Sequence, residues 1–305
     1  MNMEAQIGGM TMSSPVILAS GTCNFGRELS EYINFSDVGG ICSKGLTLAP
    51  RTGNDGCRVA ETPSGMLNSV GLQNPGVEYF IENDLAFMAS LGTRVIVNVA
   101  GHSTDDYLKM ASFLNEHAEK IDALELNLSC PNVKEGCMII GSSPKEIREL
   151  VRKVRDITDL PLWVKLTPNV TSIADTALAA QEGGADAVVV INTLLGMAID
   201  LDTRRPILRN NTGGLSGPAI KPVALRMVSE CRRVLDIPIV GCGGAADYKD
   251  VLEFMIAGAS AVEIGTALMI HPTLPYKIIE DLQKYMQEKN ISKLSDIVGT
   301  LQLWG

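Results

Sequence analysis

Short runs of apolar residues recur along the chain, and most are followed by a stretch in which apolar positions recur with helical spacing. A parallel strand that is covered on both faces is almost continuously apolar, so these runs predict buried strands. Eight strands are predicted, at residues 15–20, 38–44, 94–99, the start of 123–132, 162–166, 186–192, 237–240 and 261–264.

The long segments between the predicted strands carry helix start and stop signals. Serine or aspartate stands at the expected N-cap positions, and glycine follows two of the helices. The clearest helices are predicted over residues 145–155, 172–181 and 248–256. Eight strands alternating with helices predict the α/β class and a (β/α)8 TIM barrel. Because no linker or compositional shift interrupts this alternation, we expect a single domain over residues 1–305.

Two connections are too long to be simple turns. They cover about residues 45–79 and 193–218, and each follows the carboxyl end of a predicted strand. Long connections within a compact domain are usually binding loops or lids. We therefore expect both to lie over the C-terminal face of the barrel, where the active sites of such barrels are found.

Polar side chains interrupt the apolar pattern near the carboxyl ends of the strands. These residues are Ser20, Lys44, Asn98, Asn127, Lys165, Asn192 and Thr193. One such residue would be explained as a capping or snorkelling side chain, whereas several at one end of a barrel favour a binding site. A buried ammonium group is costly unless it faces an anion or a strong acceptor. A cofactor with a phosphate and an electron-poor ring, together with an anionic substrate, would account for both lysines.

Small residues end the last two predicted strands, as Gly243-Gly244 and as Gly265-Thr266. Their backbone N–H groups could approach a phosphate closely, aided by a helix N-terminus, and barrels frequently build a phosphate site there. Tight-turn glycines are the alternative for either loop alone. A dinucleotide-binding motif at 241–246, with Glu263 as its acidic residue, is disfavoured because too little chain remains for a separate nucleotide fold.

A cysteine follows the fourth predicted strand. Apolar and polar residues alternate from Ala123 to Asn127, and Cys130 precedes a proline, which cannot continue a strand ladder. The thiol is therefore expected on the active-site face of the barrel. A buried, inert cysteine is the alternative.

The composition narrows the class of protein. A net charge of −9 argues against sequence-independent nucleic-acid binding, which needs clustered basic residues. The seven cysteines include no Cys-x-x-Cys pair, so we expect no zinc or iron–sulfur site in this chain. Free thiols favour a cytoplasmic location. We expect no signal peptide and no membrane span, because the start has no basic region before an apolar run and no apolar stretch is long enough to cross a bilayer.

With these features, the chain resembles the dihydroorotate dehydrogenases, the FMN enzymes of pyrimidine biosynthesis, along nearly its whole length. The matching motifs lie at residues 43–45, 68–72, 127–132, 165–168, 214–218, 241–244 and 264–266. Together these motifs are far more specific than any one of them alone.

The resemblance implies roles for matching positions. It implies that FMN is held by Ser20, Lys44, Gly45, Asn98, Asn127, Lys165, Ile191, Gly217, Gly243, Gly244, Gly265 and Thr266. It implies that orotate or dihydroorotate is held by Lys44, Asn68, Ser69, Val70, Gly71, Leu72, Asn127, Asn192 and Thr193. Cys130 would be the base that removes the C5 proton while hydride passes from C6 to flavin N5. A thiol with a modestly lowered pKa is a usable base.

The resemblance also indicates a subclass. The membrane-linked class has serine at the base position and an N-terminal extension, whereas this chain has Cys130 and is expected to lack such an extension. Residues 72–80 and 133–138 look like class 1B, whose electrons reach NAD+ through a separate subunit carrying FAD and a [2Fe–2S] cluster. A homodimer of this chain with two such subunits, a heterotetramer, is the implied assembly. Cys137, where glycine is expected, and Ile140, where an aromatic residue is expected, depart from the pattern.

Three alternatives stay open on the sequence. The first is the fumarate-linked class 1A dihydroorotate dehydrogenase, which needs no partner subunit. The second is a tRNA-dihydrouridine synthase-like FMN enzyme, which the acidic charge and the lack of a basic C-terminal helical domain disfavour. The third is a non-catalytic barrel that binds a phosphate-bearing ligand.

Overall fold

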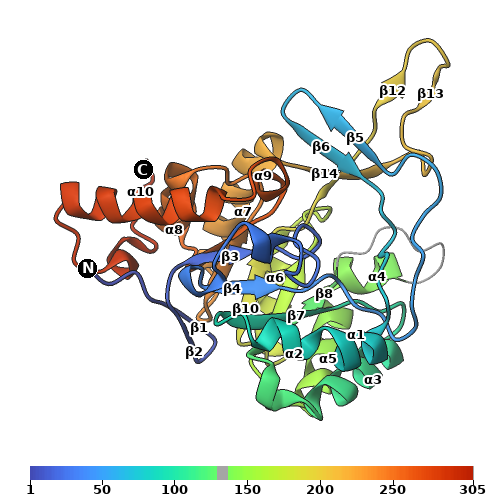
Figure 1. The fold of residues 1–305 in the computed structure, drawn as a ribbon, viewed down its shortest axis with the longest axis horizontal. Helices are drawn as coiled ribbons and strands as arrows, with labels where there is room; N and C mark the ends of the chain where they lie inside the picture. The colour runs from blue at the N-terminus through green and yellow to red at the C-terminus, as the bar shows by residue number, and fades with distance from the viewer. Residues whose placement is uncertain (129–136, 305) are drawn as a thin grey trace.

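The computed structural model describes residues 1–128 and 137–304 (Figure 1). At its centre, eight parallel strands close into a barrel in the order β10-β15-β16-β3-β4-β7-β8-β9. Their bounds are β3 Val16–Leu18, β4 Gly40–Cys42, β7 Arg94–Val99, β8 Ala123–Asn127, β9 Leu162–Leu166, β10 Ala187–Val190, β15 Ile239–Cys242 and β16 Ala261–Ile264. All eight predicted strands are confirmed, and the TIM barrel with them.

Alternate residues of each strand point into the barrel, because side chains alternate between the two faces of a strand. The apolar part of the interior contains Ile17, Ile96, Ala123, Trp163, Val189, Val240 and Ala261. An antiparallel hairpin, β1 (Ala5–Ile7) and β2 (Met10–Met12), packs into the same cluster. Apolar packing therefore fills part of the barrel interior and leaves the C-terminal end of the strands for polar side chains.

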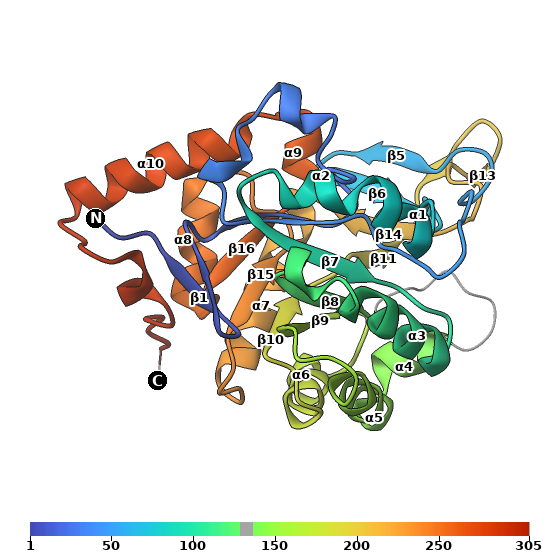
Figure 2. The ribbon, with the colours of Figure 1, turned by 60° about the horizontal axis from the view of Figure 1, so that its bottom comes forward.

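Helices surround the barrel and cover the outer faces of the strands (Figure 2). They are α1 Val77–Asn83, α2 Leu85–Ala89, α3 Thr104–Asn115, α4 Cys137–Ser142, α5 Pro144–Arg155, α6 Ile173–Glu182, α7 Lys221–Arg232, α8 Tyr248–Ala257, α9 Thr266–Ile270 and α10 Leu274–Glu288. Short 3-10 turns lie at Leu29–Glu31, Phe35–Asp37, Ala118–Lys120, Pro218–Ile220 and Leu294–Ile297. Among the described helices, none is both long and apolar enough to cross a membrane.

The three helices with predicted boundaries form as expected. Ser143 and Ser172 each accept a hydrogen bond from the backbone N–H of the third helical residue, so they cap α5 and α6. Asp247 caps α8 in the same way, and Gly258 ends that helix with a positive φ. Local capping chemistry therefore sets the ends of these three helices.

The two long connections pair with each other instead of remaining simple loops. β5 (Val59–Thr62) and β6 (Gly65–Asn68) come from the first connection, and β11 (Leu194–Gly196) and β14 (Gly213–Ser216) come from the second. They form one antiparallel sheet, here called the lid sheet, in the order β11-β14-β6-β5. It lies beyond the C-terminal end of the barrel, as predicted for these connections (Figure 1).

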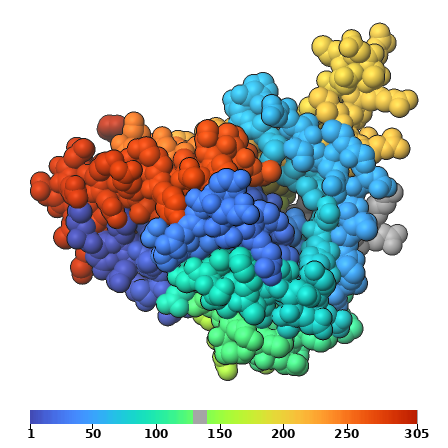
Figure 3. Space-filling model, in the orientation of Figure 1, coloured from blue at the N-terminus to red at the C-terminus, as the bar shows by residue number. Residues whose placement is uncertain are grey.

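A second, shorter hairpin extends the lid region. β12 (Ile199–Asp200) pairs with β13 (Arg205–Pro206), and the pair projects from the body of the molecule (Figure 3). The dinucleotide-binding alternative for residues 241–246 is excluded, because β15 and β16 are neighbouring strands of the closed barrel.

Candidate active site

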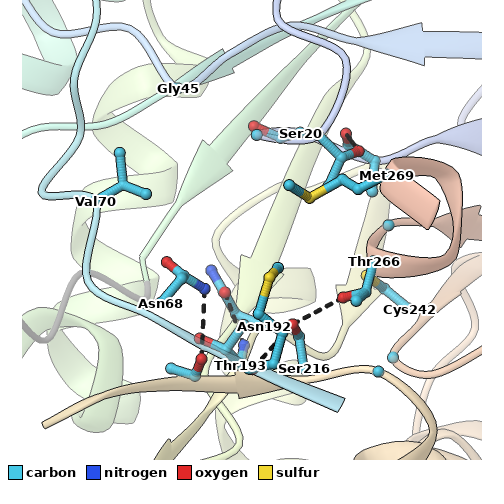
Figure 4. Close-up of a pocket in the computed structure, with 18 of the residues that line it drawn as sticks. Ser20, Gly45, Asn68, Val70, Asn192, Thr193, Ser216, Cys242, Thr266 and Met269 are labelled. Carbon is cyan, nitrogen blue, oxygen red and sulfur yellow. Dashed lines mark hydrogen bonds between the residues drawn. The ribbon is translucent and has the colours of Figure 1, made fainter. Parts of the chain in front are cut away.

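A pocket opens at the C-terminal ends of the barrel strands, between them and the lid sheet (Figure 4). Asn68, Asn192 and Thr193 lie on one side of it, whereas Ser20, Thr266 and Met269 lie on another. The predicted residues that line the pocket are Ser20, Lys44, Gly45, Asn68, Val70, Gly71, Leu72, Asn127, Lys165, Ile191, Asn192, Thr193, Gly217, Gly243, Gly244, Gly265 and Thr266. Positions spread over most of the chain therefore converge on one cavity.

Three predicted site residues stand apart from this lining. Cys130 lies outside the described residues. Asn98 is fully buried behind the pocket wall, where its Oδ1 accepts a hydrogen bond from the lining residue Asn127. Ser69 is also buried, and its backbone N–H donates to the carbonyl oxygen of Arg58, so this residue belongs to the packing beneath the lid.

Three asparagines from different strands form a chain of hydrogen bonds that leads from the pocket into the barrel. Asn192 Nδ2 donates to Asn127 Oδ1 at 3.2 Å, and Asn127 Nδ2 donates to Asn98 Oδ1 at 3.4 Å. Asn98 Nδ2 then donates to Glu125 Oε1 in the barrel interior. The three amides are thereby held in fixed orientations, although only Asn127 and Asn192 face the pocket.

Lys165 lies at the floor of the pocket with its ammonium group turned toward two buried carboxyls. Its Nζ donates to Glu263 Oε2 and lies 3.6 Å from Glu125 Oε1. The side chains of both glutamates are inaccessible to solvent. The buried ammonium group thus has anionic partners within the protein itself, whereas a cofactor and an anionic substrate were expected to supply them.

The buried charges shift one another's proton affinities. Burial raises the pKa of the Glu263 carboxyl from 4.5 to about 8, and the neighbouring Glu125 adds to this shift. Burial also acts to raise the pKa of Glu125, but Lys165 and several hydrogen bonds hold that pKa below its usual range. Burial alone would lower the pKa of Lys165, yet the negative groups around it hold that pKa well above 10.5.

The glycine loops after β15 and β16 have free hydrogen-bond donors. Among the described residues, no group accepts from the backbone N–H of Gly243, Gly244 or Thr266. These loops meet the end of the lid sheet, where Thr266 Oγ1 donates to Ser216 Oγ at 2.7 Å. Unpaired backbone donors beside a cavity fit the oxygens of a phosphate group.

The N-terminus of the helix after β15 is partly occupied by the protein's own carboxylates. Asp247 accepts from the N–H groups of Lys249 and Asp250, and Asp250 accepts from those of Ala246 and Asp247. Carboxylates therefore already accept from several N–H groups at the start of α8. The N–H groups of Gly243 and Gly244 remain available to a phosphate at this loop.

Two glycines in the pocket wall have no room for a side chain. A Cβ atom on Gly45 would lie 2.7 Å from Asn98 Oδ1. A Cβ atom on Gly244 would lie 2.6 Å from the carbonyl oxygen of Gly217, and its φ of +81° also favours glycine. A side chain is therefore excluded by the buried Asn98 amide at Gly45 and by the Gly217 backbone at Gly244.

Sequence reasoning missed several residues of the pocket lining and of the barrel interior beneath it. Glu125 and Glu263 precede Asn127 and Gly265 by two positions, so strand alternation alone could have placed them on the inner face. Ser216 and Met269, by contrast, line the pocket itself. They had no local signal, because the pairing of the lid sheet and the short helix α9 bring them there.

Together, the fold and the site define a class of protein. It is an enzyme-type TIM barrel that offers free backbone donors to a phosphate beside its last two strands and places lysines and amides in a cleft beneath a lid.

Comparison with known proteins identifies the family within this class. The family model for dihydroorotate dehydrogenase matches residues 2–286. The chain is 49% identical over 303 residues to a protein of Thermoanaerobacter pseudethanolicus and 47% identical over 303 residues to one of Caldicellulosiruptor bescii, covering 99% of this chain and 100% of each relative. It is 48% identical over 302 residues to a protein of Bacteroides fragilis, with 99% of both chains covered. All three relatives are named dihydroorotate dehydrogenase B (NAD(+)), catalytic subunit. The chain therefore belongs to the dihydroorotate dehydrogenase family.

Proposed function

We propose that this chain oxidises dihydroorotate to orotate in pyrimidine biosynthesis, as the catalytic subunit of an NAD+-linked dihydroorotate dehydrogenase. The observation that carries this proposal is that one pocket contains two kinds of binding groups. Free backbone donors suited to a phosphate lie at one end, and lysines and asparagines suited to a small anionic amide ligand lie beneath the lid sheet. The names of the full-length relatives support the same activity.

The proposed cofactor is FMN, bound within a single barrel domain over residues 1–305. The unpaired N–H groups of Gly243, Gly244 and Thr266 would hold its phosphate. Lys165 lies at the pocket floor, where its positive charge would stabilise negative charge that the cofactor ring gains on reduction. When bound, FMN supplies the acceptor for the hydride that leaves C6 of dihydroorotate.

The substrate would lie against the lid side of the pocket. Lys44 is a suitable partner for its carboxylate, and the amides of Asn68, Asn127 and Asn192 can both donate to and accept from its ring carbonyl and N–H groups. Cys130 is the proposed base for the C5 proton. A thiol has an ordinary pKa of about 8.5, so a modest lowering makes it an effective base near neutral pH.

Electrons are proposed to leave through a partner subunit that carries FAD and a [2Fe–2S] cluster, in a heterotetramer with two copies of this chain. The relatives' names describe catalytic subunits. The lid region also exposes the apolar side chains of Met197, Ile199 and Leu201. Exposed apolar side chains of this kind are often buried in protein–protein interfaces. A cytoplasmic location without membrane or nucleic-acid contact is part of the proposal.

An acceptor screen tests this function. The purified chain should be yellow, and dihydroorotate should bleach its flavin absorbance without oxygen. NAD+ should be reduced rapidly only when a candidate FAD and iron–sulfur subunit is added. Rapid turnover of the isolated chain with fumarate would instead establish the class 1A alternative, and a protein that takes up no FMN would contradict the flavoenzyme proposal.

A further inference from the structure

The barrel interior beneath the pocket contains one cation and two carboxyls. Lys165 contacts Glu263 and lies 3.6 Å from Glu125, and carboxyl oxygens of the two glutamates lie within 4.8 Å of each other. Glu125 Oε2 and Glu263 Oε1 are buried, and no donor of the described residues reaches either atom.

Two neighbouring carboxyls can hydrogen-bond to each other only if one of them keeps a proton, because an ionised carboxylate can only accept. With both groups ionised, the cluster would carry a net negative charge in a site without solvent, and two like charges would face each other. One retained proton removes both problems. It supplies the missing donor, and it leaves Lys165 balanced by a single negative charge.

A metal ion is the other way to satisfy such a cluster. Ligand atoms of Cys42, Glu125 and Glu263 lie within 4.8 Å of one another. The ammonium group of Lys165 already lies against both carboxyls, however, and a cation among them would face it directly. The geometry favours a proton over a metal ion.

We propose that Glu125 and Glu263 share one proton beneath the pocket and act as positioning residues for Lys165, so that the pair sets the electrostatic potential that the bound flavin experiences. The redox part of this inference rests on the proposed function. Two carboxyls that hold one proton keep the cluster neutral, whereas loss of that proton adds a negative charge below the flavin. Reduced flavin carries more negative charge than oxidised flavin, so the midpoint potential falls when the proton leaves.

The neighbouring groups do not titrate in the same range. Burial raises the pKa of the Cys23 thiol to about 12 and raises the pKa values of the Cys42 and Cys242 thiols further, so all three remain protonated. The raised pKa of Lys165 keeps it charged. Asn98 does not titrate, and Lys44 on the pocket wall is present in every variant below. The proton on the carboxyl pair, by contrast, is lost near the raised pKa of Glu263, about 8.

The test measures the midpoint potential of bound FMN by dye equilibration at pH 7 and pH 9.5. The proteins are the wild-type holoenzyme, Glu125→Gln, Glu263→Gln and the double variant, with the exposed lid variant Glu61→Gln as the control. Each single variant keeps one carboxylate beside Lys165. At pH 7 its midpoint potential should therefore lie within about 30 mV of the wild-type value. For two electrons, this limit corresponds to a tenfold change in the ratio of reduced to oxidised flavin. The midpoint potential of the double variant should lie above the wild-type value by more than this limit.

At pH 9.5 the wild-type potential should fall below that of both single variants by more than the same limit, while Glu61→Gln follows the wild type. If the midpoint potential of either single variant at pH 7 lies above the wild-type value by more than the limit, both carboxyls are ionised in the wild type. That result would overturn the proposal. Potentials that fall in parallel with pH in all proteins would overturn it as well.

Infrared spectroscopy of the wild-type protein gives an independent readout without a variant. A buried protonated carboxyl should give a C=O band at pH 7 that shifts in D2O and is lost at pH 9.5, whether or not flavin is bound. Absence of that band would contradict the shared proton. A protein that shows the band but binds no FMN would contradict only the proposed function, so the two failures are distinguishable.

Discussion

Asn192 donates a hydrogen bond to Asn127 across the mouth of the barrel, although 65 positions separate the two residues in the chain. The direction of this bond is decided deeper in the barrel. Glu125 accepts from Asn98, which leaves the Asn98 oxygen to accept from Asn127 and the Asn127 oxygen to accept from Asn192. An amide that faces the pocket is thus oriented by a buried acid that does not line it.

Removing the middle of this chain should disturb both stability and binding. Asn98→Ala removes the amide that donates to Glu125 Oε1 and accepts from Asn127 Nδ2, so we expect the free energy of unfolding to fall by about 1–3 kcal/mol. FMN affinity should fall too, because Asn127 loses its fixed orientation. Urea unfolding and FMN titration measure the two effects. Asn83→Ala is the control, since Asn83 is exposed and its side chain bonds only within α1 in the described part of the chain. Equal effects of the two substitutions would contradict this role.

The pH dependence of stability should reflect the raised pKa of Glu263. Its folded-state pKa of about 8 exceeds the unfolded value of 4.5, so its protonated form stabilises the fold below pH 4.5, and this contribution is lost as the pH rises toward 8. The wild-type free energy of unfolding should therefore fall relative to Glu263→Gln between pH 5 and 8, by at most about 1.4 kcal/mol per pH unit. Urea titrations across this range measure the free energy of unfolding of both proteins. If the two values change in parallel with pH, Glu263 makes no such contribution.

Replacement of the proposed base should slow flavin reduction without removing the flavin. Cys130→Ser exchanges a thiol for a much weaker acid, and loss of a general base typically costs about 10²–10⁴-fold in rate. Anaerobic stopped-flow mixing with dihydroorotate at pH 7 measures flavin bleaching directly. Cys57→Ser, which changes an exposed thiol outside the pocket, should bleach at the wild-type rate. Wild-type bleaching by Cys130→Ser would show that another group removes the proton.

Gly265 offers a way to separate phosphate binding from folding. A Cβ atom there meets only Ala19 at 3.6 Å and Thr22 at 3.9 Å, so Gly265→Ala should retain the wild-type melting temperature. The added methyl group should still weaken FMN binding at least tenfold, about 1.4 kcal/mol, by obstructing the approach of the phosphate. Gly244→Ala is the comparison, since its strained φ and its contact with Gly217 should lower stability as well. An unchanged FMN dissociation constant in Gly265→Ala would place the phosphate elsewhere.

The projecting hairpin should contribute to assembly. Leu201 is 87% exposed beside the exposed Met197 and Ile199, so Leu201→Asp should weaken association at least tenfold while flavin content stays unchanged. Analytical ultracentrifugation, with and without the candidate partner subunit, measures the association. Val234→Asp places the same charge at an exposed apolar position near the end of α7 and should assemble normally. Normal assembly of Leu201→Asp would remove the hairpin from the interface.

The sequence by itself determined the strands, the caps of three helices and most of the pocket lining. These features depend on local patterns, since a strand covered on both faces must be apolar and a polar residue at its end stands out. The alternation of residues 123–127 also carried the information that Glu125 and Asn127 share a face, although only Asn127 was assigned to the site.

The tertiary structure alone decided which of these groups meet. Lys165 and Glu263 are 98 positions apart, and closure of the barrel brings them into contact. In the same way, the pairing of β6 with β14 joins two apparent loops into one sheet over the pocket. Strand register and barrel closure are properties of the whole chain, and no local pattern encodes them.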